Sequence, residues 1–295
     1  MQNMDAGIGN LVRRATPEAL RPAARRVLQL ARTNYDRYVY ERPSGGLRKR
    51  MAMDAATPDF LEKAEVLCRD GIVIFPSYFG GDELASMQEE FERLIQSNPP
   101  DEEAAKTNAI HIATGRLADS LLLSRLAFHA EILRYAQYYW GKQVVLIGTG
   151  GTRIEPFDSE DYGSYQWHHD AKRKQFRAMI LLTDVPVGGQ HMRYMSGTHN
   201  KFRSDHEILN SRITPDEAAA HGKEVACAGP AGTLVLFDTN GTHRGNRNLG
   251  PRRDHWQFTY RAPGRSALQD RRPVPLHPEI LSGLTPEQRQ IARCS

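Results

Sequence analysis

The chain has 295 residues, of which 40% are hydrophobic and 25% are charged, a composition typical of a globular protein that can bury a full core. Its apolar runs are shorter than the roughly 18 residues that span a bilayer, and its first residues lack the charged start and apolar stretch of a secretory signal. The three cysteines are far apart, which excludes a disulfide framework and a CxxC metal clip, so we expect a cytoplasmic location.

The formal charge of +4 is unevenly distributed along the chain. Residues 1–56 hold eleven basic and five acidic residues, a net charge of +6, whereas the rest of the chain holds 28 and 30. Residues 17–41 place apolar side chains at helical intervals with arginines on the other face. Such a helix can lie on an acidic membrane surface or a partner, or it can pack on its own domain, and we favour packing. The segment 1–56 is therefore predicted to be a basic helical extension and linker.

A more compact pattern begins at residue 57. The predicted elements are, in order, a helix that ends at Gly71, a short strand that ends at Pro76, a helix capped by Asp82, and helical sequence around 118–140. Short strand-like runs then recur between glycine and proline turn signals, at 142–149, 176–185, 191–197, 224–228, 233–239 and 254–261. Helices followed by many short strands indicate an α+β, mainly β, sandwich or barrel with helices against one sheet.

The chain closes with a proline-rich segment. Residues 263–295 follow the last strand-like run, and Thr285 and Gln288 have the spacing of a capping box that starts a short helix. The predicted organisation is thus the extension 1–56, a β-rich domain over 57–262, and the tail 263–295.

A candidate metal site lies in QWHHDAK, residues 166–172. In an extended stretch His168 and Asp170 share a face, and His169 points away. An imidazole and a carboxylate suit a divalent metal but need a third ligand, for which His243, just after a strand-like run, is the strongest candidate. Two histidines and one carboxylate form the facial triad of non-haem Fe(II) oxygenases, although zinc also accepts this set.

Five blocks around this motif resemble, in order, the phytanoyl-CoA dioxygenase family of Fe(II)/2-oxoglutarate oxygenases. The blocks are residues 67–95, 167–170, 178–199, 231–248 and 252–261. The resemblance covers most of 58–261 and implies a double-stranded β-helix, a cupin-like jelly-roll barrel with helices packed on its major sheet. It also implies that His168, Asp170 and His243 bind Fe(II), with 2-oxoglutarate and O2 as co-substrates.

The resemblance further implies a basic residue on the closing strand that holds the distal carboxylate of 2-oxoglutarate. Arginine suits this role because its planar fork matches a carboxylate with two hydrogen bonds. Arg252 and Arg253 are both available, and either follows His243 by slightly fewer residues than the family usually has. If Trp256 and its alternate neighbours pack against helices, Arg253 faces the lumen, so we prefer Arg253.

Four further residues have more than one interpretation. Leu182 lies on a strand that is expected to form the base of the 2-oxoglutarate pocket. It either lines the pocket or belongs to the core, and the two interpretations are compatible. Arg153 either reaches the pocket or is a strand residue without a role in it. His169 is not expected to be a ligand, and we favour a surface position over a place beside the metal or substrate. His191 is expected in a solvated turn.

The implied activity is a dioxygenase that hydroxylates an aliphatic C–H bond of a small metabolite, with release of succinate and CO2. The carboxylate of Asp170 argues against halogenation, because some relatives have Gly or Ala there to admit a halide. Several basic residues form either an entrance for an anionic substrate or a solvated loop: Lys172, Arg173, Lys174, Arg177, Arg193, Lys201 and Arg203.

Two other functions stay open at this point. One is a zinc-dependent hydrolase on a similar barrel, and the other is a non-catalytic binding protein that keeps the fold. Nucleic-acid binding is not expected, because the barrel region has no basic stripe interleaved with stacking aromatics. The sequence specifies neither the substrate nor the oligomeric state.

Overall fold

The structure is a computed structural model of the chain. It describes residues 22–24, 27, 46, 50, 57–98, 108–157, 163–170, 174–200, 212–246, 248–263 and 273–293. The chain divides into two compact units, Met1–Arg42 and Pro43–Ser295, and the basic helix predicted at 17–41 lies almost entirely outside the described residues. Within the described ranges, every helix is too short or too polar to cross a membrane.

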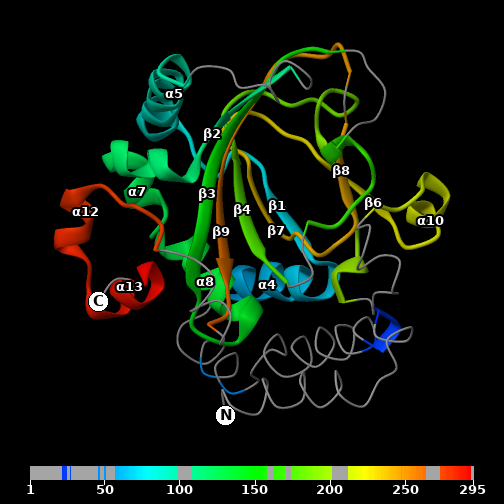
Figure 1. The fold of residues 1–295 in the computed structure, drawn as a ribbon, viewed down its shortest axis with the longest axis horizontal. Helices are drawn as coiled ribbons and strands as arrows, with labels where there is room; N and C mark the ends of the chain where they lie inside the picture. Colours follow the sequence, from blue (N-terminus) through cyan, green and yellow to red (C-terminus); the bar gives the residue numbers. More distant parts are fainter. Residues whose placement is uncertain are drawn as a thin grey trace. The chain divides into compact units, whose positions relative to one another are not determined.

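A six-stranded antiparallel sheet forms the centre of the second unit (Figure 1). Its strands, in order across the sheet, are β1 (Ile72–Phe75), β7 (Leu234–Asp238), β4 (Phe176–Leu181), β9 (Arg253–Arg261), β3 (Val145–Ile154) and β2 (Ala109–Ile112). Each predicted strand-like run overlaps one of these strands or a strand of the smaller sheet, and the strand predicted at 142–149 continues to Ile154 through a glycine-rich stretch.

A three-stranded sheet lies opposite, with the order β6 (Glu224–Cys227), β5 (Met192–Met195) and β8 (His243–Gly245). Apolar side chains from both sheets form one cluster, in which Met179 and Phe237 of the large sheet meet Tyr194 and Cys227 of the small one. The fold is therefore α+β and mainly β, as predicted. In the described residues its two sheets form a sandwich and do not close into one continuous barrel.

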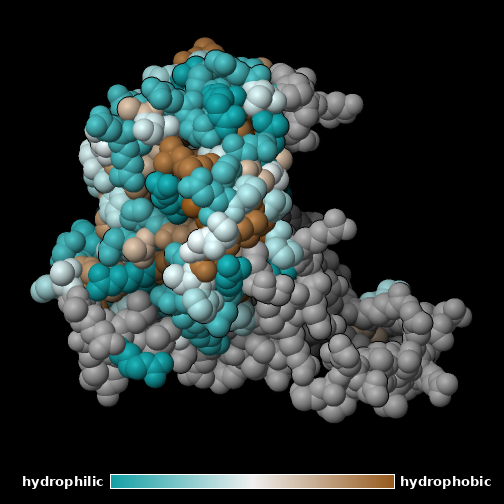
Figure 2. Space-filling view, turned by 90° about the vertical axis from the view of Figure 1, so that its left-hand side faces the viewer, coloured by the Kyte–Doolittle hydropathy of each residue, from teal (hydrophilic) through white to brown (hydrophobic). Residues whose placement is uncertain are grey.

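Helices cover the outer face of the large sheet (Figure 1). The helical elements are α4 (Pro58–Asp70), α5 (Gly81–Gln96), η2 (Thr114–Asp119), α7 (Leu121–Leu126), α8 (Ala130–Trp140), η3 (Gly163–Tyr165), η4 (Thr198–Asn200), α10 (Pro215–Ala219), α12 (Pro278–Gly283) and α13 (Pro286–Ala292). The side of the molecule where α5, α7 and α12 lie has a mainly hydrophilic surface with smaller hydrophobic patches (Figure 2).

The main core lies between these helices and the large sheet. Trp256, Phe258 and Tyr260 alternate along β9 and are all buried in it, and the ring of Trp256 meets Phe91 of α5 edge to face at 6.1 Å. Burying each such side chain contributes about 1.5–3 kcal/mol. The C-terminal segment 273–293 adds Leu276, Leu284 and Ile291 to the same core, so it buttresses the sheet.

Helix ends follow the predicted signals with one exception. Helix α4 ends at Gly71 with φ 78°, a left-handed conformation that favours glycine, and the capping box of Thr285 and Gln288 is formed. The prediction that Asp82 caps α5 is wrong. The extended residue Gly80 is the N-cap, and Asp82 lies in the first turn, where its negative charge still interacts favourably with the helix dipole.

Candidate metal centre and cofactor pocket

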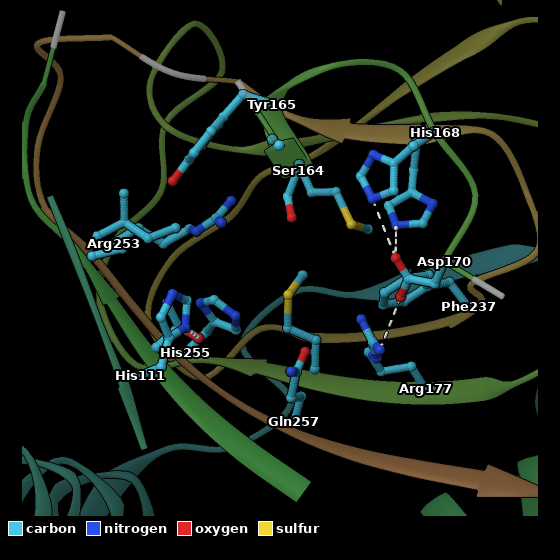
Figure 3. Close-up of a pocket in the computed structure, with 18 of the residues that line it drawn as sticks. His111, Ser164, Tyr165, His168, Asp170, Arg177, Phe237, Arg253, His255 and Gln257 are labelled. Carbon is cyan, nitrogen blue, oxygen red and sulfur yellow. Dashed lines mark hydrogen bonds and ion pairs between the residues drawn. The ribbon is translucent and has the colours of Figure 1, made fainter. Parts of the chain in front are cut away.

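A cavity of about 460 Å³ opens between the two sheets (Figure 3). It is lined by Ala109, His111, Thr152, Ile154, Gly163, Ser164, Tyr165, His168, Asp170, Arg177, Met179, Met192, Arg212, Phe237, His243, Gly245, Arg253, His255 and Gln257. All three predicted metal ligands and Arg253 are among them, so residues that are 85 positions apart in the sequence meet in one space.

Backbone pairing brings His168 and His243 together. The amide of each donates to the carbonyl of the other, at 2.9 and 2.8 Å, as in a short antiparallel bridge. Such a pair places its two side chains on the same face, and the centroids of the two imidazole rings are 4.4 Å apart. The isolated bridge at His168 and the start of β8 at His243 thus bring together two ligands that are 75 residues apart in the sequence.

Asp170 completes the group from the same extended stretch. Its amide donates to the Thr239 carbonyl at 3.0 Å, and its Oδ1 lies 3.2 Å from Nε2 of His168 and 3.4 Å from Nε2 of His243. The candidate ligand atoms of the three residues lie within 4.8 Å of one another. His-x-Asp alternation therefore has the geometric outcome that the sequence predicts.

The hydrogen bonds of both imidazoles fit a metal ion. Nδ1 of His168 lies 2.7 Å from the Gln166 carbonyl, and Nδ1 of His243 lies 2.8 Å from the Gly241 carbonyl. A carbonyl only accepts, so each Nδ1 carries the proton and each Nε2 directs a lone pair toward Asp170. Burial, reinforced by His243, lowers the pKa of His168 and favours the neutral form that binds metals.

Asp170 is held in its charged form by Arg177 of β4. Burial by itself would raise the pKa of Asp170, but the positive charge of the Arg177 guanidinium holds it well below its usual range. Nη2 of Arg177 lies 2.9 Å from Oδ2, the oxygen that does not face the histidines. Sequence reasoning placed Arg177 in a basic entrance and missed this pairing. The donor set of two imidazoles and one ionised carboxylate fits a divalent ion such as Fe(II).

Arg253 reaches the same cavity from β9. It is 7% exposed, and its Nη1 donates to the Gln190 carbonyl at 2.6 Å. No carboxylate among the described residues forms an ion pair with it, although a buried guanidinium normally has an anionic partner. Tyr165 points into the cavity from the opposite side, with its hydroxyl toward Arg253 (Figure 3).

Arg252 and Leu182 lie outside the cavity lining. The Arg252 side chain is 44% exposed, and its Nε lies 3.4 Å from Oδ2 of Asp254. Leu182 follows the end of β4 on the face shared by Ala178 and Ile180, so it packs in the core under the helices. Of the two interpretations of Leu182, its packing supports plain core, and it does not line the described cavity.

Three polar residues differ from their expected surroundings. Arg153 does not reach the pocket, because its side chain faces the helices and pairs with Asp254 at 2.8 Å and Glu92 at 2.6 Å. His169 and His191 are 2% and 5% exposed, so both are buried and neither decorates the surface.

The predicted basic entrance is only partly described. Lys172, Arg173, Lys201 and Arg203 lie outside the described residues. Of the other three, Arg177 binds Asp170, Arg193 pairs with Glu224 at 2.7 Å, and Lys174 contacts Asn200. These contacts favour structural roles over a solvated loop.

Comparison with known proteins gives a consistent result. The model of the family described as phytanoyl-CoA dioxygenase (PhyH) matches residues 67–254. An ectoine dioxygenase of Stutzerimonas stutzeri is 25% identical over 226 residues, which is 66% of this chain and 74% of the relative. A second ectoine dioxygenase, from Sphingopyxis alaskensis, is 25% identical over 230 residues, covering 66% and 72%.

Solved structures share the fold. The non-haem α-ketoglutarate-dependent epimerase SnoN from nogalamycin biosynthesis superposes with a TM-score of 0.60 at 23% identity, over 69% of this chain and 84% of that chain. EctD from S. alaskensis with bound Fe gives 0.57 at 21% identity, over 82% and 87%. At these identities the likeness supports the double-stranded β-helix architecture.

Proposed function

We propose that this chain, which belongs to the phytanoyl-CoA dioxygenase family, hydroxylates an aliphatic C–H bond of a small anionic metabolite. It is an Fe(II)- and 2-oxoglutarate-dependent dioxygenase, and the co-substrate is therefore converted to succinate and CO2. The observation that best supports hydroxylation here is the combination, in one cavity, of two Nε2 atoms facing the Asp170 carboxylate with a buried arginine that has no described acidic partner.

Each residue of the cavity has a role in this proposal. His168, Asp170 and His243 hold Fe(II), which supplies the activation of O2 coupled to oxidative decarboxylation of 2-oxoglutarate. Arg253 binds the distal carboxylate of 2-oxoglutarate through its planar fork. Arg177 keeps Oδ2 of Asp170 in place.

The apolar part of the wall has a different task. Met179, Met192 and Phe237 line the cavity beside the metal ligands. They exclude water from the region where the substrate C–H bond must lie, and this strengthens the electrostatic contacts that orient both substrates.

The charge of the lining favours an anionic substrate. Among the described lining residues three arginines, Arg177, Arg212 and Arg253, stand against one carboxylate, Asp170. The charge of a divalent metal ion is balanced by the two negative charges of 2-oxoglutarate. The excess positive charge of the lining therefore persists when both are bound. Ectoine, which the relatives' name gives as their substrate, belongs in the first substrate screen.

The alternative functions have less support. A zinc hydrolase needs a general base beside the metal, and Asp170, which faces both histidines, is the single Asp or Glu among the described lining residues. A non-catalytic binding protein has no need for the complete His/Asp/His set with its oriented tautomers. We also propose that residues 57–262 form the catalytic domain, with 263–295 as its buttress and 1–56 as an extension.

The proposal is tested with the purified full chain. Calorimetry should show binding of the redox-silent ion Mn(II) and then of 2-oxoglutarate. Succinate release with Fe(II) and O2 should rise when a screen of small acids and ectoine contains the substrate. If neither Mn(II) nor 2-oxoglutarate binds, the proposal fails. Hydrolytic activity that survives without oxygen and depends on zinc would favour the hydrolase.

A further inference from the structure

A row of polar side chains lies along the wall of the cavity near Arg253 (Figure 3). His111 of β2 is paired in register with Thr152 of β3, and Thr152 is paired with His255 of β9. Cross-strand partners project from the same face of a sheet, and all three residues line the cavity. His111 and His255 lie side by side at its lower wall, opposite Tyr165 (Figure 3). The row therefore presents two imidazoles and a hydroxyl to one space.

The next row along β9 continues this polar surface. Gln257 lines the cavity two residues after His255, on the same face of the strand. Its neighbour on β3 is Gly150, which has no side chain. A Cβ at Gly150 would lie 3.3 Å from the Ile112 carbonyl oxygen and 3.7 Å from the Gln257 amide nitrogen. A glycine inside a strand often marks a close approach of another backbone, and here the approaching group is the Ile112 carbonyl.

His255 is the member of the row whose hydrogen bonding is incomplete. Its side chain is 6% exposed, and its buried Nδ1 has no partner among the described residues. Nδ1 of His111, by contrast, lies 3.2 Å from Oγ1 of Thr152. Leaving a buried imidazole nitrogen without a partner destabilises a protein, so a ligand that supplies this hydrogen bond would be favoured.

The surroundings of the row determine which chemical groups fit it. Burial, reinforced by the positive charges of Arg253 and Arg177, lowers the pKa of His255 well below its ordinary value, so its ring is neutral. The single carboxylate in the described lining, Asp170, is engaged with Arg177 and both metal-binding histidines. An amine or amidinium would therefore find no available acidic partner among the described lining residues.

We propose that His111, Thr152, His255 and Gln257, termed the polar strip, form a substrate subsite that binds uncharged hydroxyl groups. The proposal rests on the proposed function and deepens it, because it makes the substrate a hydroxylated acid. A hydroxyl both donates and accepts, as do a neutral imidazole, a threonine hydroxyl and a primary amide. It can therefore satisfy Nδ1 of His255 in either tautomer, which a carbonyl or an ether cannot.

The test uses two acids of equal length that differ in their hydroxyl groups. The full chain, loaded with Mn(II) and 2-oxoglutarate, is titrated by calorimetry with D-gluconate and with hexanoate. We expect gluconate to bind at least about tenfold more tightly, because each uncharged hydrogen bond contributes several-fold in affinity. Loading by Mn(II) and 2-oxoglutarate is measured first, so that failure of the proposed function is seen separately.

Variants connect the preference to the polar strip. His255→Leu and the milder Thr152→Val should each reduce the gluconate-over-hexanoate ratio about three- to tenfold while binding 2-oxoglutarate as the wild type does. The matched control is Thr233→Val, since Thr233 is also buried, donates to a backbone carbonyl and does not line the cavity. It should keep the ratio.

Three results would overturn the proposal. Equal binding of the two acids, or no binding of gluconate, would remove the hydroxyl subsite while leaving the dioxygenase assignment intact. An unchanged ratio in a folded Thr152→Val protein would show that the preference arises elsewhere. If the wild type does not bind Mn(II) and 2-oxoglutarate, the proposed function fails, and the subsite fails with it.

Discussion

Arg177 and Asp170 form an ion pair with 2.9 Å between Nη2 and Oδ2, while Oδ1 of the same carboxylate lies 3.2 Å from Nε2 of His168. The two carboxylate oxygens are thereby assigned to different partners. Arg177 also lies next to Thr259, with Nε 3.4 Å from Oγ1. This arrangement fixes the rotation of Asp170 and leaves one oxygen for a metal ion, which makes Arg177 a positioning residue.

Replacing Arg177 with glutamine should weaken metal binding about 10- to 100-fold, because the partners of a ligating carboxylate orient it. Titration with Mn(II) or Co(II) measures this without reference to turnover, and the absorption spectrum of bound Co(II) should change as the carboxylate reorients. Arg134→Gln is the matched control, since Arg134 pairs with Glu131 at 3.3 Å on helix α8, away from the cavity. Unchanged Mn(II) affinity in Arg177→Gln would contradict the positioning role.

The two adjacent histidines of the motif should separate in their effects. His168→Ala removes an Nε2 that faces Asp170, so stoichiometric Mn(II) binding and succinate release should both be lost. His169→Ala leaves the three candidate ligands intact but truncates a side chain that is 2% exposed. It should lower the melting temperature and keep one metal ion per chain. Metal analysis combined with thermal unfolding checks both outcomes, and loss of metal from a folded His169→Ala protein would count against the assignment.

The adjacent arginines 252 and 253 offer a similar comparison. Arg253→Met should raise the Kd for 2-oxoglutarate about 100-fold, because truncating one partner of a buried, charge-assisted pair costs about 2–5 kcal/mol. Arg252→Met removes a side chain that is 44% exposed and lies outside the cavity, so its Kd should stay near the wild-type value. Calorimetry with Mn(II)-loaded protein measures both constants. A larger effect for Arg252→Met would reverse the assignment.

Patterns of period two predicted much of the site. His-x-Asp alternation placed His168 and Asp170 on one side, and the aromatic residues of β9 correctly predicted which of its residues face the cavity. The position of His243 just after a strand-like run made it the third candidate, and the resemblance supported it and implied the dioxygenase activity, which alternation could not supply. Prediction from alternation succeeds where the information is local. Prediction from resemblance succeeds where the motifs of a known family occur in the same order along the chain.

Contacts between residues on different strands could not be predicted from the sequence pattern. The pairing of Arg177 with Asp170 depends on β4 lying beside a loop that precedes it, and no local period encodes that neighbour. The polar strip depends on β2 and β3, and the four-residue β2 is too short for a clear alternation. His169 was placed at the surface because alternation says only that it faces away from the metal, and the opposite side here is protein.

Arg153 connects the large sheet to helix α5. Its side chain is 8% exposed, donates to both oxygens of Asp254 and also contacts Glu92. Arg153→Met should lower the free energy of unfolding by about 3–5 kcal/mol, because the buried Asp254 loses the guanidinium that donates to both its oxygens and keeps only the longer contact with the half-exposed Arg252. Urea unfolding measures the change. Arg93→Met, which breaks an ion pair of a side chain that is 51% exposed, should have a much smaller effect. Equal effects would contradict the importance of burial.

His199 should make stability depend on pH between about 4 and 6.5. Its side chain is fully buried, and its Nε2 lies 3.2 Å from the Cys68 carbonyl oxygen. Burial, together with the charge of Lys174 and against that of Asp238, lowers its pKa from 6.5 to about 4. The unfolded chain therefore takes up a proton at a higher pH than the folded protein does.

The sign of the effect follows from this difference. The stability contributed by neutral His199 is present above pH 6.5 and is lost as the pH falls toward 4. Urea unfolding of the wild type and of His199→Gln, measured from pH 7.5 to pH 4.5, should show a steeper fall for the wild type. The difference in fall should reach up to about 3 kcal/mol, since each pKa unit corresponds to about 1.4 kcal/mol. Parallel curves for the two proteins would show that His199 takes up its proton at the same pH in the folded and the unfolded chain.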